Sequence, residues 1–477
     1  MANDLVLIGS GFASAFFLKK YLEHAGPRVR VVVLERGHID SLAWQIEHQR
    51  SSQVVSEDHY TNRTPEKPWR FTLGFGGGSN CWWACTPRFM PNDFRLQSTY
   101  GVGRDWPIGY EDLEPYYEEA EQIMSVSGPH PTPYPKSGPY PLPPHRLTDA
   151  DEQFQKHYPD SYFVQPTARA SVDTESRPRC CGNGVCSICP VNAKFTILNG
   201  MLDVLMDDRV ELRFGATARS VETVGTTARA VVYEQDGQES RVEGDLIAVG
   251  ANAVFNPYLL QRSGLDHPKL GRNLHEQISQ GVILDLDGVD HYNGSTSING
   301  HGYMFYDGDH RSHRPAALIE SSSIPHLSGA LRAEPGKWLQ RMSLKFIFEE
   351  LPQVDNRVEI DTDDPTKPTT SHSNYSDYAL RGIRALPELV EKLIGPLPIE
   401  NYRIADKVNP TEAHVMGTCV MSSDPSEGIV DDHLIHHKVR NLLVLGSSAF
   451  PTCSPANPTL TLSALSLRSA DHLFGKA

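Results

Sequence analysis

The sequence contains little that would carry the chain into or across a membrane. No apolar stretch approaches the ~18 residues of a spanning helix, and the first residues run directly into an apolar segment without the basic region and cleavage site of a secretion signal. We therefore expect a chain with no membrane span that stays in the cytoplasm.

An excess of positive charge is also missing. The 477 residues carry 44 basic and 59 acidic side chains, for a formal net charge of −15, so a nucleic acid is not expected as a partner.

The sequence contains no internal repeat. With 39% hydrophobic residues, a chain of this length can bury a large core and should form two domains.

The amino-terminal region has the pattern of a nucleotide-binding β-α-β unit. Residues 5–8 (Leu-Val-Leu-Ile) predict a buried strand, residues 9–14 (Gly-Ser-Gly-Phe-Ala-Ser) a tight turn, and residues 15–23 a helix. A second strand over 29–34 then leads to an acidic residue, Glu35. Strand, turn, helix, strand and acid in this order predict a dinucleotide site; the alternative is a purely structural β-α-β unit.

Particular residues of this unit have expected roles. Gly9 and Gly11 would let the backbone approach a pyrophosphate at the helix amino end. Ser14 stands where a third glycine or alanine is usual, so helix and strand must accommodate a hydroxyl. Glu35 would bind the ribose hydroxyls, and Arg36 follows it against the cofactor.

Two polar residues near the carboxyl terminus suggest alcohol oxidation. His414 could take the hydroxyl proton, while Asn457 could orient the oxygen as hydride leaves the carbon. The strand over 441–446 would bring Gly446 to the cofactor, and Pro458 suits the first turn of a helix with Asn457 at its N-cap. The alternative is a satisfied core histidine and an ordinary helix cap.

Several separated segments, in order, resemble the glucose-methanol-choline (GMC) oxidoreductase family, whose members use FAD to oxidise alcohols and sugars. They are the amino-terminal fingerprint, the loop 76–84 (Gly-Gly-Gly-Ser-Asn-Cys-Trp-Trp-Ala), and the segments 106–117, 250–264, 271–274 and those around His414 and Asn457. The resemblance implies that His414 is the catalytic base. It also implies FAD contacts from Gly77, Gly78, Ser79, Trp83, Ala84, Gly250, Ala251, Gly446, Pro458 and Thr459.

The resemblance implies an α/β fold, α+β overall: a Rossmann-like FAD-binding domain and a discontinuous cap with an antiparallel substrate-binding sheet. We expect the FAD-binding domain to comprise residues 1–44, 70–95, 201–275 and 405–477. Residues 96–200 would form the cap and cysteine region, and 276–404 the substrate-binding domain, with a helix from about 377 to 393. The proline-rich stretch 128–144 predicts a loop.

Four of the eight cysteines fall within ten residues, at Cys180, Cys181, Cys186 and Cys189. Thiolates so crowded suit a metal or an iron–sulfur cluster. The run is similar to one in bacterial FAD-dependent glucose and fructose dehydrogenases, where the cysteines matching Cys180, Cys181 and Cys186 hold a [3Fe-4S] cluster; Cys189 could be a fourth ligand. A zinc site, a local disulfide and free buried thiols are the alternatives, although zinc sites usually use separated cysteine pairs.

The glycine loop bears on how the flavin is held. Cys81 occupies the position at which pyranose oxidases attach FAD through histidine, so we expect non-covalent FAD; an 8α-thioether is the alternative. Trp82 and Trp83 should contribute packing. The remaining cysteines should be small buried side chains, namely Cys85, Cys419 and Cys453.

Together these patterns predict an FAD-dependent dehydrogenase that oxidises a hydroxyl of a sugar, glycoside or polyol. Electrons would leave through the cluster to an acceptor such as a cytochrome c subunit. The resemblance also implies a small chaperone-like subunit whose signal could carry the chain to the periplasm. The alternatives are an oxidase that reduces O2 to H2O2 and a flavoprotein of this fold without redox turnover.

Overall fold

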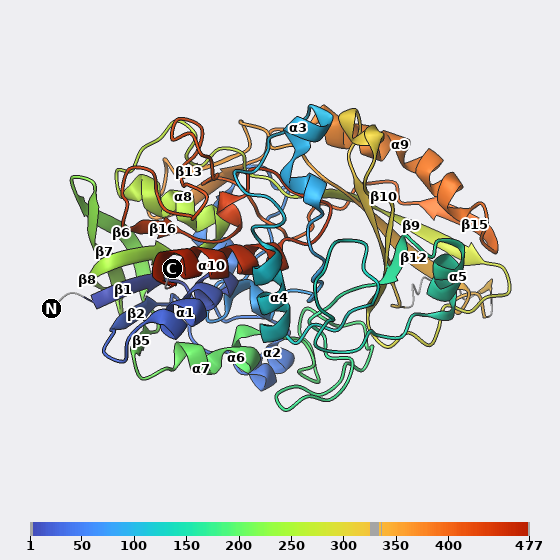
Figure 1. Cartoon of the computed structure of the whole chain (residues 1–477), viewed down its shortest axis with the longest axis horizontal. Coiled ribbons are helices and arrows are strands. Elements are labelled where there is room, and N and C mark those ends of the chain that lie inside the picture. Colours follow the sequence, from blue (N-terminus) through green and yellow to red (C-terminus); the bar gives the residue numbers. More distant parts are fainter. Residues whose placement is uncertain (1–2, 325–332, 335, 476–477) are drawn as a thin grey trace.

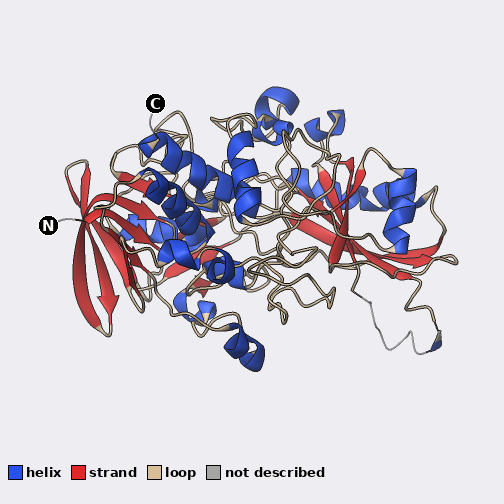
Figure 2. Ribbon diagram, turned by 60° about the horizontal axis from the view of Figure 1, so that its bottom comes forward, coloured by secondary structure: helices blue, strands red, loops and turns tan. Residues whose placement is uncertain are grey.

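The structure is a computed structural model that describes residues 3–324, 333–334 and 336–475. Two large sheets lie at opposite ends of an elongated molecule, with helices and long loops between them (Figures 1 and 2). One sheet is mainly parallel and the other antiparallel, so the expected α/β fold with an antiparallel second sheet is confirmed.

The first sheet has seven strands in the order β5-β2-β1-β8-β7-β6, with β16 also paired to β8. Residues 244–249 of β8 pair in parallel with β1, whereas residues 238–243 pair antiparallel with β7. The parallel part is apolar because both of its faces are covered. Its strands are β1 (Asn3–Ile8), β2 (Val31–Leu34), β5 (Val210–Arg213), β8 (Gln238–Val249) and β16 (Leu442–Val444), and the hairpin adds β6 (Thr217–Val224) and β7 (Thr227–Gln235).

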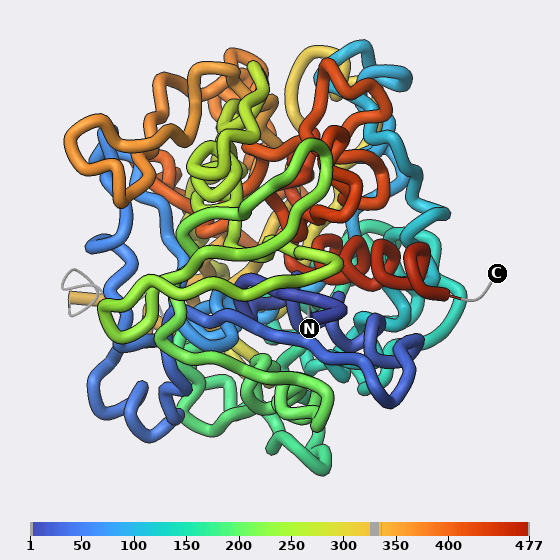
Figure 3. Tube along the Cα trace, turned by 90° about the vertical axis from the view of Figure 1, so that its left-hand side faces the viewer, coloured from blue at the N-terminus to red at the C-terminus, as the bar shows by residue number. Residues whose placement is uncertain are grey.

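Helices from the two ends of the chain pack together on this sheet. Helix α1 (Phe12–His24) contacts α10 (Thr459–Phe474), which in turn contacts α4 (Glu114–Ile123). Figure 3 shows α10, in red, beside the blue amino-terminal segment. On the other side, α8 (Asn252–Arg262) packs against β6. The first and last segments of the chain therefore build one body.

The second sheet has six antiparallel strands in the order β15-β9-β12-β11-β10-β4. Helix α9 (Asp377–Ile394) covers it with Leu386, Leu389, Val390 and Leu393, which recur at helical spacing on one face. Helix α5 (Asp149–His157) packs beside β4. The strands are β4 (Tyr162–Val164), β9 (Ile278–Leu286), β10 (Ile298–Phe305), β11 (Ala317–Ser322), β12 (Arg341–Phe348) and β15 (Ile399–Ile404).

Several short elements lie outside the two large sheets. A three-stranded sheet has the order β13-β14-β3, and residues 128–144 contain no helix or strand, as expected. No helix among the described residues is long and apolar enough to span a bilayer. The short elements are α2 (Leu42–His48), α3 (Leu96–Tyr100), α6 (Ile197–Gly200), α7 (Leu202–Leu205), β3 (Thr61–Asn62), β13 (Arg357–Ile360) and β14 (Pro368–Ser371).

Two predicted helix starts are wrong. Helix α1 begins at Phe12 rather than at residue 15, and its N-cap is Gly11. The N-cap of α10 is Pro458, already in helical conformation, and not Asn457. The Asn457 side chain is engaged with His414 instead, so a contact from elsewhere in the fold prevails over the local capping preference.

Candidate active site

A cavity of about 890 Å³ lies between the two sheets. The carboxyl ends of β1, β2 and β8 line one part, and β9, β11 and β12 line the other. Both predicted catalytic residues, His414 and Asn457, face this cavity. So do the predicted cofactor residues Gly9, Gly11, Glu35, Arg36, Gly77, Gly78, Trp83, Ala84, Gly250, Ala251, Gly446, Pro458 and Thr459.

Glycines make the cofactor end of the cavity a narrow cradle of backbone. Gly9 has φ +89°, and a Cβ there would lie 2.7 Å from the carbonyl oxygen of Gly250. Gly77 has φ +49°, and a Cβ there would lie 3.4 Å from Gly11 Cα. Side chains at these positions would clash or fill the space in which a pyrophosphate approaches the backbone. The cradle therefore fits a dinucleotide such as FAD.

Two predicted cofactor residues lie behind the cavity wall instead of lining it. Ser14 is buried and its hydroxyl donates to the Ile8 carbonyl at 3.4 Å, where the helix crosses the strand. Ser79 is also buried, and its hydroxyl oxygen accepts from the Ile197 amide at 3.1 Å. Both serines thus support the cradle through packing and hydrogen bonds.

Glu35 ties the end of β2 to the fingerprint turn. One carboxylate oxygen accepts from the Ser10 amide at 3.1 Å and from the Ser10 hydroxyl at 2.6 Å, and the other accepts from the Gly37 amide at 2.8 Å. Carboxylate oxygens can accept further bonds, so Glu35 can still bind ribose. Beside it, burial lowers the pKa of Arg36 to about 10, and the guanidinium lies 4.5 Å from the Phe255 ring centroid.

The protonation of His414 follows from the orientation of one amide. Gln277, just before β9, donates through Nε2 to the carbonyls of Ser454 at 2.7 Å and Ala456 at 3.0 Å. Its Oε1 must then face His414 Nδ1, 3.1 Å away, so Nδ1 carries the proton. His414 Nε2 is left as the free base. It lies 3.4 Å from Asn457 Nδ2.

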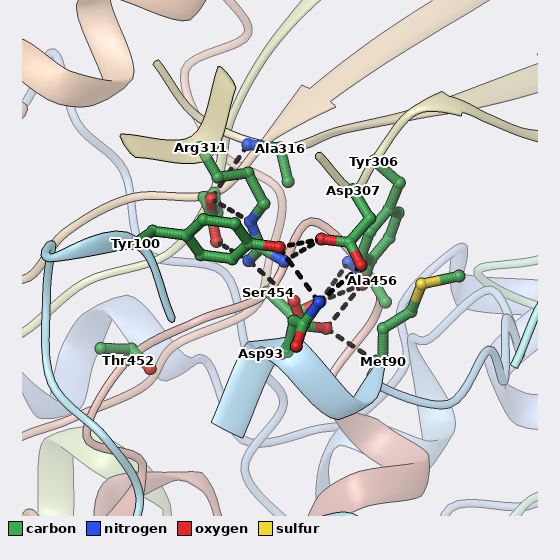
Figure 4. Close-up of polar contacts among 12 residues, drawn as sticks. Met90, Asp93, Tyr100, Tyr306, Asp307, Arg311, Ala316, Thr452, Ser454 and Ala456 are labelled. Atoms are coloured by element: carbon green, nitrogen blue, oxygen red, sulfur yellow. Dashed lines mark hydrogen bonds and ion pairs between the residues drawn. The ribbon is translucent and has the colours of Figure 1, made fainter. Parts of the chain in front are cut away.

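A buried hydrogen-bond network holds the two carbonyls that orient Gln277 (Figure 4). The Tyr306 hydroxyl donates to Asp93 at 2.8 Å and lies 2.5 Å from the Ser454 hydroxyl, which accepts from the Ala456 amide at 3.0 Å. Arg311 in turn donates to Asp93 at 2.8 Å. The network fixes the 454–456 turn and, through it, the Gln277 amide.

The loop that carries His414 is fixed by Glu276. One carboxylate oxygen accepts from the backbone amides of His414 at 3.0 Å and Glu412 at 3.1 Å. The other forms a buried ion pair with Lys67. Neighbouring residues of the chain, Glu276 and Gln277, thus hold the backbone and the ring of the histidine respectively.

His414 is half-buried and uncharged at neutral pH. Burial lowers its pKa to about 4, Lys345 acts in the same direction, and Glu412 and Glu320 oppose it. Asn457 is buried, and its Oδ1 has no hydrogen-bond partner among the described residues. The unprotonated Nε2 of His414 and the Asn457 side chain, whose NH₂ group has a second N–H to donate, face the same cavity. This arrangement is expected where a hydroxyl group binds.

A charged wall lines the cavity on the side of the second sheet. Lys345 Nζ lies 2.8 Å from Glu412 and 3.5 Å from Glu320, its cross-strand neighbour. Burial raises the pKa of Glu320, but the charges of Lys345 and His301 outweigh it and lower the pKa to about 2. Burial lowers the pKa of Lys345, yet the two carboxylates outweigh it and raise the pKa above its ordinary value.

Several of these residues were not predictable from the sequence. Glu320 and Lys345 lie in strands, Glu276 and Gln277 lie just before β9, and Glu412 lies in the loop before His414. None of them belongs to a motif with a chemical signature. Their only sequence signal is a charged or amide side chain near an apolar strand, which surface residues share. Their roles depend on contacts between distant segments.

The two tryptophans of the glycine loop have different surroundings. Trp82 packs edge-on against Phe12, with ring centroids 4.6 Å apart, and donates to the Phe195 carbonyl at 2.8 Å, so its packing role is confirmed. Both tryptophans line the cavity, but Trp83 is 36% exposed, so the packing prediction for Trp83 is wrong. Cys81 lines the cavity too. The three remaining cysteines are buried as expected, at Cys85, Cys419 and Cys453.

The clustered cysteines lie outside the cavity. Cys180 Sγ lies 3.5 Å from the Thr296 hydroxyl and Cys186 Sγ lies 3.2 Å from the Ser297 hydroxyl, while Cys181 is exposed. No three His, Cys, Asp or Glu side chains of the described residues converge as a metal-binding group. The three predicted ligands are therefore not brought together as they would be around a cluster.

Comparisons with known proteins agree with this geometry. Two models described as "GMC oxidoreductase" match residues 68–279 and 352–466. The fructose dehydrogenase large subunit of Gluconobacter japonicus is 26% identical over 99% of this chain and 98% of that protein. The 6'''-hydroxyparomomycin C oxidase of Streptomyces lividus is 25% identical over 98% of this chain and 92% of that protein. The crystal structure of pyridoxine 4-oxidase from Mesorbium loti superposes with a TM-score of 0.71, at 19% identity and 100% coverage of both chains.

Proposed function

Because the chain belongs to the GMC oxidoreductase family of FAD-dependent enzymes acting on CH–OH groups, we propose that it is a dehydrogenase of a sugar, glycoside or polyol. The observation that carries this proposal is the unprotonated Nε2 of His414, which faces the cavity beside the Asn457 amide. FAD, when bound in the glycine cradle, would supply the hydride acceptor.

The residues of the chain perform the proton chemistry and the positioning. His414 Nε2 accepts the proton of the substrate hydroxyl, because Nδ1 is already occupied by its bond to Gln277. Asn457 can donate through Nδ2 to the same oxygen and so orient the C–H bond. As His414 gains charge, the carboxylates of Glu412 and Glu320 favour the protonated ring.

The charged wall supports a substrate with several hydroxyl groups. Glu320 and Glu412 can accept hydrogen bonds from sugar hydroxyls and Lys345 can donate to them. Similarity to a fructose dehydrogenase subunit and to an aminoglycoside-named oxidase agrees with a polyhydroxylated substrate. The pair of carboxylates against one ammonium favours a neutral or cationic substrate over a sugar acid.

The second part of the proposal is that electrons leave one at a time through an iron–sulfur cluster held by Cys180, Cys181 and Cys186. Similarity to the fructose dehydrogenase large subunit and the four crowded cysteines support it. The cysteine loop also adjoins the cavity wall, because Lys194 donates to the carbonyls of both Trp82 and Ser187 at 3.1 Å. Because the thiols do not converge among the described residues, the loop must rearrange around a cluster.

Similarity to a protein named as a large subunit, that of fructose dehydrogenase, also supports a partner chain for this protein. We propose a one-electron acceptor such as a cytochrome c subunit, and a small subunit that carries an export signal to the periplasm. This is tested by co-expression with candidate partner chains followed by size-exclusion chromatography. A chain that elutes alone and passes no electrons to cytochrome c contradicts the proposal.

The function is tested by anaerobic mixing of the FAD-loaded protein with a panel of sugars, glycosides and polyols. At least one of these compounds should bleach the flavin absorbance on the time scale of catalytic turnover. Ferricyanide should then restore the absorbance faster than O2 does. Bleaching with stoichiometric H2O2 formation in air would instead identify an oxidase. No bleaching with any alcohol would indicate a flavoprotein without redox turnover.

A further inference from the structure

The second sheet presents a polar face to the cavity. In β11 and β12, Glu320 pairs with Lys345 and Ser322 pairs with Ser343 across the two strands, and all four residues line the cavity. The intervening Leu344 points to the other face and packs in the apolar core beneath α9. Because side chains alternate between the two faces of a strand, the polar side chains serve the cavity and not the core.

The pair of serines continues across two further strands. Ser322 also pairs with Ile298 of β10, and Ser343 also pairs with Ile283 of β9. All four side chains belong to residues that line the cavity, and we call Ile298, Ser322, Ser343 and Ile283 the serine row. The row carries no charge, because two hydroxyl groups lie side by side between two isoleucines. It therefore differs in chemistry from the charged wall beside it.

The hydroxyl groups of the serine row have unused hydrogen-bonding capacity. Ser322 Oγ accepts from the Ile324 amide at 3.2 Å and keeps its own proton to donate. The Ser343 hydroxyl makes no hydrogen bond within the part of the chain that the structure describes. Both serines are half-buried. A ligand in the cavity can thus bind to both hydroxyl groups.

An exposed tryptophan borders the serine row. Arg169 donates to the Trp83 carbonyl and, at 3.0 Å, to the Ile298 carbonyl, so Trp83 and Ile298 lie close together. Trp83 lines the cavity and is 36% exposed. An indole beside hydroxyl groups and isoleucines provides apolar contact together with hydrogen bonds. This combination suits a ring that has an apolar face and a polar edge.

The serine row lies farther from the catalytic base than the charged wall. At the start of β9, Gln277 contacts His414. Further along this strand, Gly281 pairs with Lys345 of the charged wall, and Ile283 follows in the serine row. From Gln277 to Ile283 the chain advances six residues, which is about 20 Å of extended strand. A single sugar ring that presents its carbinol to His414 does not span this distance.

We propose that the serine row and Trp83 form a second subsite, which binds an uncharged group linked to the oxidised unit, and that the substrate is a glycoside and not a free monosaccharide. This inference rests on the proposed function, because it takes His414 as the place of oxidation. Ser322 and Ser343 hydrogen-bond to the polar edge of the linked group, which is an aglycone or a second sugar. The isoleucines and the indole pack against its apolar face.

The test uses the full-length FAD-loaded protein in anaerobic stopped-flow measurements. D-glucose, D-galactose and D-mannose are each compared with their methyl and phenyl β-glycosides. The concentration dependence of flavin reduction gives a limiting rate and a dissociation constant for each compound. The phenyl glycoside of an oxidised sugar should bind about tenfold more tightly than the free sugar, because it also occupies the second subsite. Its limiting rate should be similar, and equal dissociation constants would overturn the proposal.

Substitutions at Ser343 locate the effect. Ser343→Leu fills the serine row and should raise the dissociation constant of the phenyl glycoside about tenfold, while the limiting rate and the binding of free sugar stay unchanged. Ser343→Ala, which adds no bulk, should produce a smaller rise. Ser240→Leu is the matched control, since Ser240 is a half-buried serine in the antiparallel pairing of β7 and β8, outside the cavity. It should match wild type throughout.

Two outcomes separate the subsite from the proposed function. If Ser343→Leu weakens free sugar and glycoside equally, the serine row contacts the oxidised ring itself and the second subsite is rejected. If no compound reduces the flavin, the proposed function is wrong, and calorimetric titration with the phenyl glycosides still tests the subsite. Binding that Ser343→Leu weakens supports the subsite, whereas no binding to wild type, or equal binding to both proteins, overturns it.

Discussion

At the scale of single residues, the chemistry depends on which nitrogen of His414 is free. Gln277 decides this, because two carbonyls fix its amide and its oxygen faces Nδ1. No carboxylate is hydrogen-bonded to this ring. The site differs in this from the triad arrangement, in which an acidic residue orients the histidine directly; here Glu412 and Glu320 act on the ring only through their charge.

Replacing His414 by alanine should leave FAD bound and slow substrate-driven flavin reduction by roughly 10²–10⁴-fold, as expected when a general base is lost. Asn457→Ala should cost less, since it removes orientation only. Anaerobic stopped-flow absorbance measures both rates. Flavin reduction at the wild-type rate in the His414 variant would assign the base elsewhere.

Gln277→Leu should slow flavin reduction about tenfold, equivalent to about 1.4 kcal/mol and comparable to one hydrogen bond. Without the amide oxygen, the histidine proton is free to occupy either ring nitrogen. The loss should appear in the limiting rate of reduction and less in the substrate dependence, since Gln277 does not line the cavity. An unchanged limiting rate would show that the tautomer is set by another contact.

The lowered pKa of His414 predicts a wide pH range of activity. The base is available above its pKa and lost below it, so flavin reduction should fall only as the pH approaches about 4. A histidine of ordinary pKa would already lose activity near pH 6.5. The limiting rate of reduction measured from pH 4 to 8 distinguishes the two cases.

At the scale of elements, the cofactor site lies where neighbouring parallel strands end. Gly9 directly follows β1 and Gly250 directly follows β8, and the two strands pair in parallel register. The strands fix the distance between the two glycines, so no adjustment of one turn can make room for a side chain.

Gly9→Ala should therefore weaken FAD binding and stability together, since the added Cβ would lie 2.7 Å from the Gly250 oxygen. Gly225→Ala is the matched control: its φ is +62°, but nothing lies within 4 Å of its Cβ. The control should cost only the ~1–2 kcal/mol of a left-handed backbone and keep its FAD. Equal flavin content in the two variants after dialysis would contradict the cradle.

Much of this element-scale organisation was predictable. The fingerprint around Gly9 and Gly11 predicts β1, α1 and β2, because apolar runs, glycines and an acid at this spacing are specific to a nucleotide-binding β-α-β unit. Gln277 was not predictable, because a glutamine before a strand has no signature. The N-cap prediction for Asn457 was wrong for the same kind of reason: its partner, His414, is distant in the sequence.

At the scale of the whole molecule, the cavity depends on a buried network far from the flavin cradle. Arg311 binds Asp93 and Glu349 and thereby supports the Tyr306–Ser454 contact that holds the Gln277 turn (Figure 4). The body around the second sheet and the 454–456 turn are thus linked through residues that do not line the cavity.

Arg311→Met should lower the free energy of unfolding by about 3–5 kcal/mol, because it leaves buried carboxylates without their partner. Denaturant unfolding followed by flavin release measures this. Arg384→Met is the control, since Arg384 pairs with Asp377 on the exposed face of α9. It should leave the free energy of unfolding within experimental scatter, and a similar loss in both variants would show that the Arg311 network carries no special stability.

The pairing of β16 with β8, and of α10 with α1, has a consequence for biosynthesis. The histidine, the asparagine and the last strand of the cradle all lie in the final segment of the chain, and their partners lie in its first and middle thirds. During translation the ribosome releases the amino-terminal strands first. The sheet therefore lacks this strand, and the cavity lacks His414 and Asn457, until residues 414–457 have been synthesised.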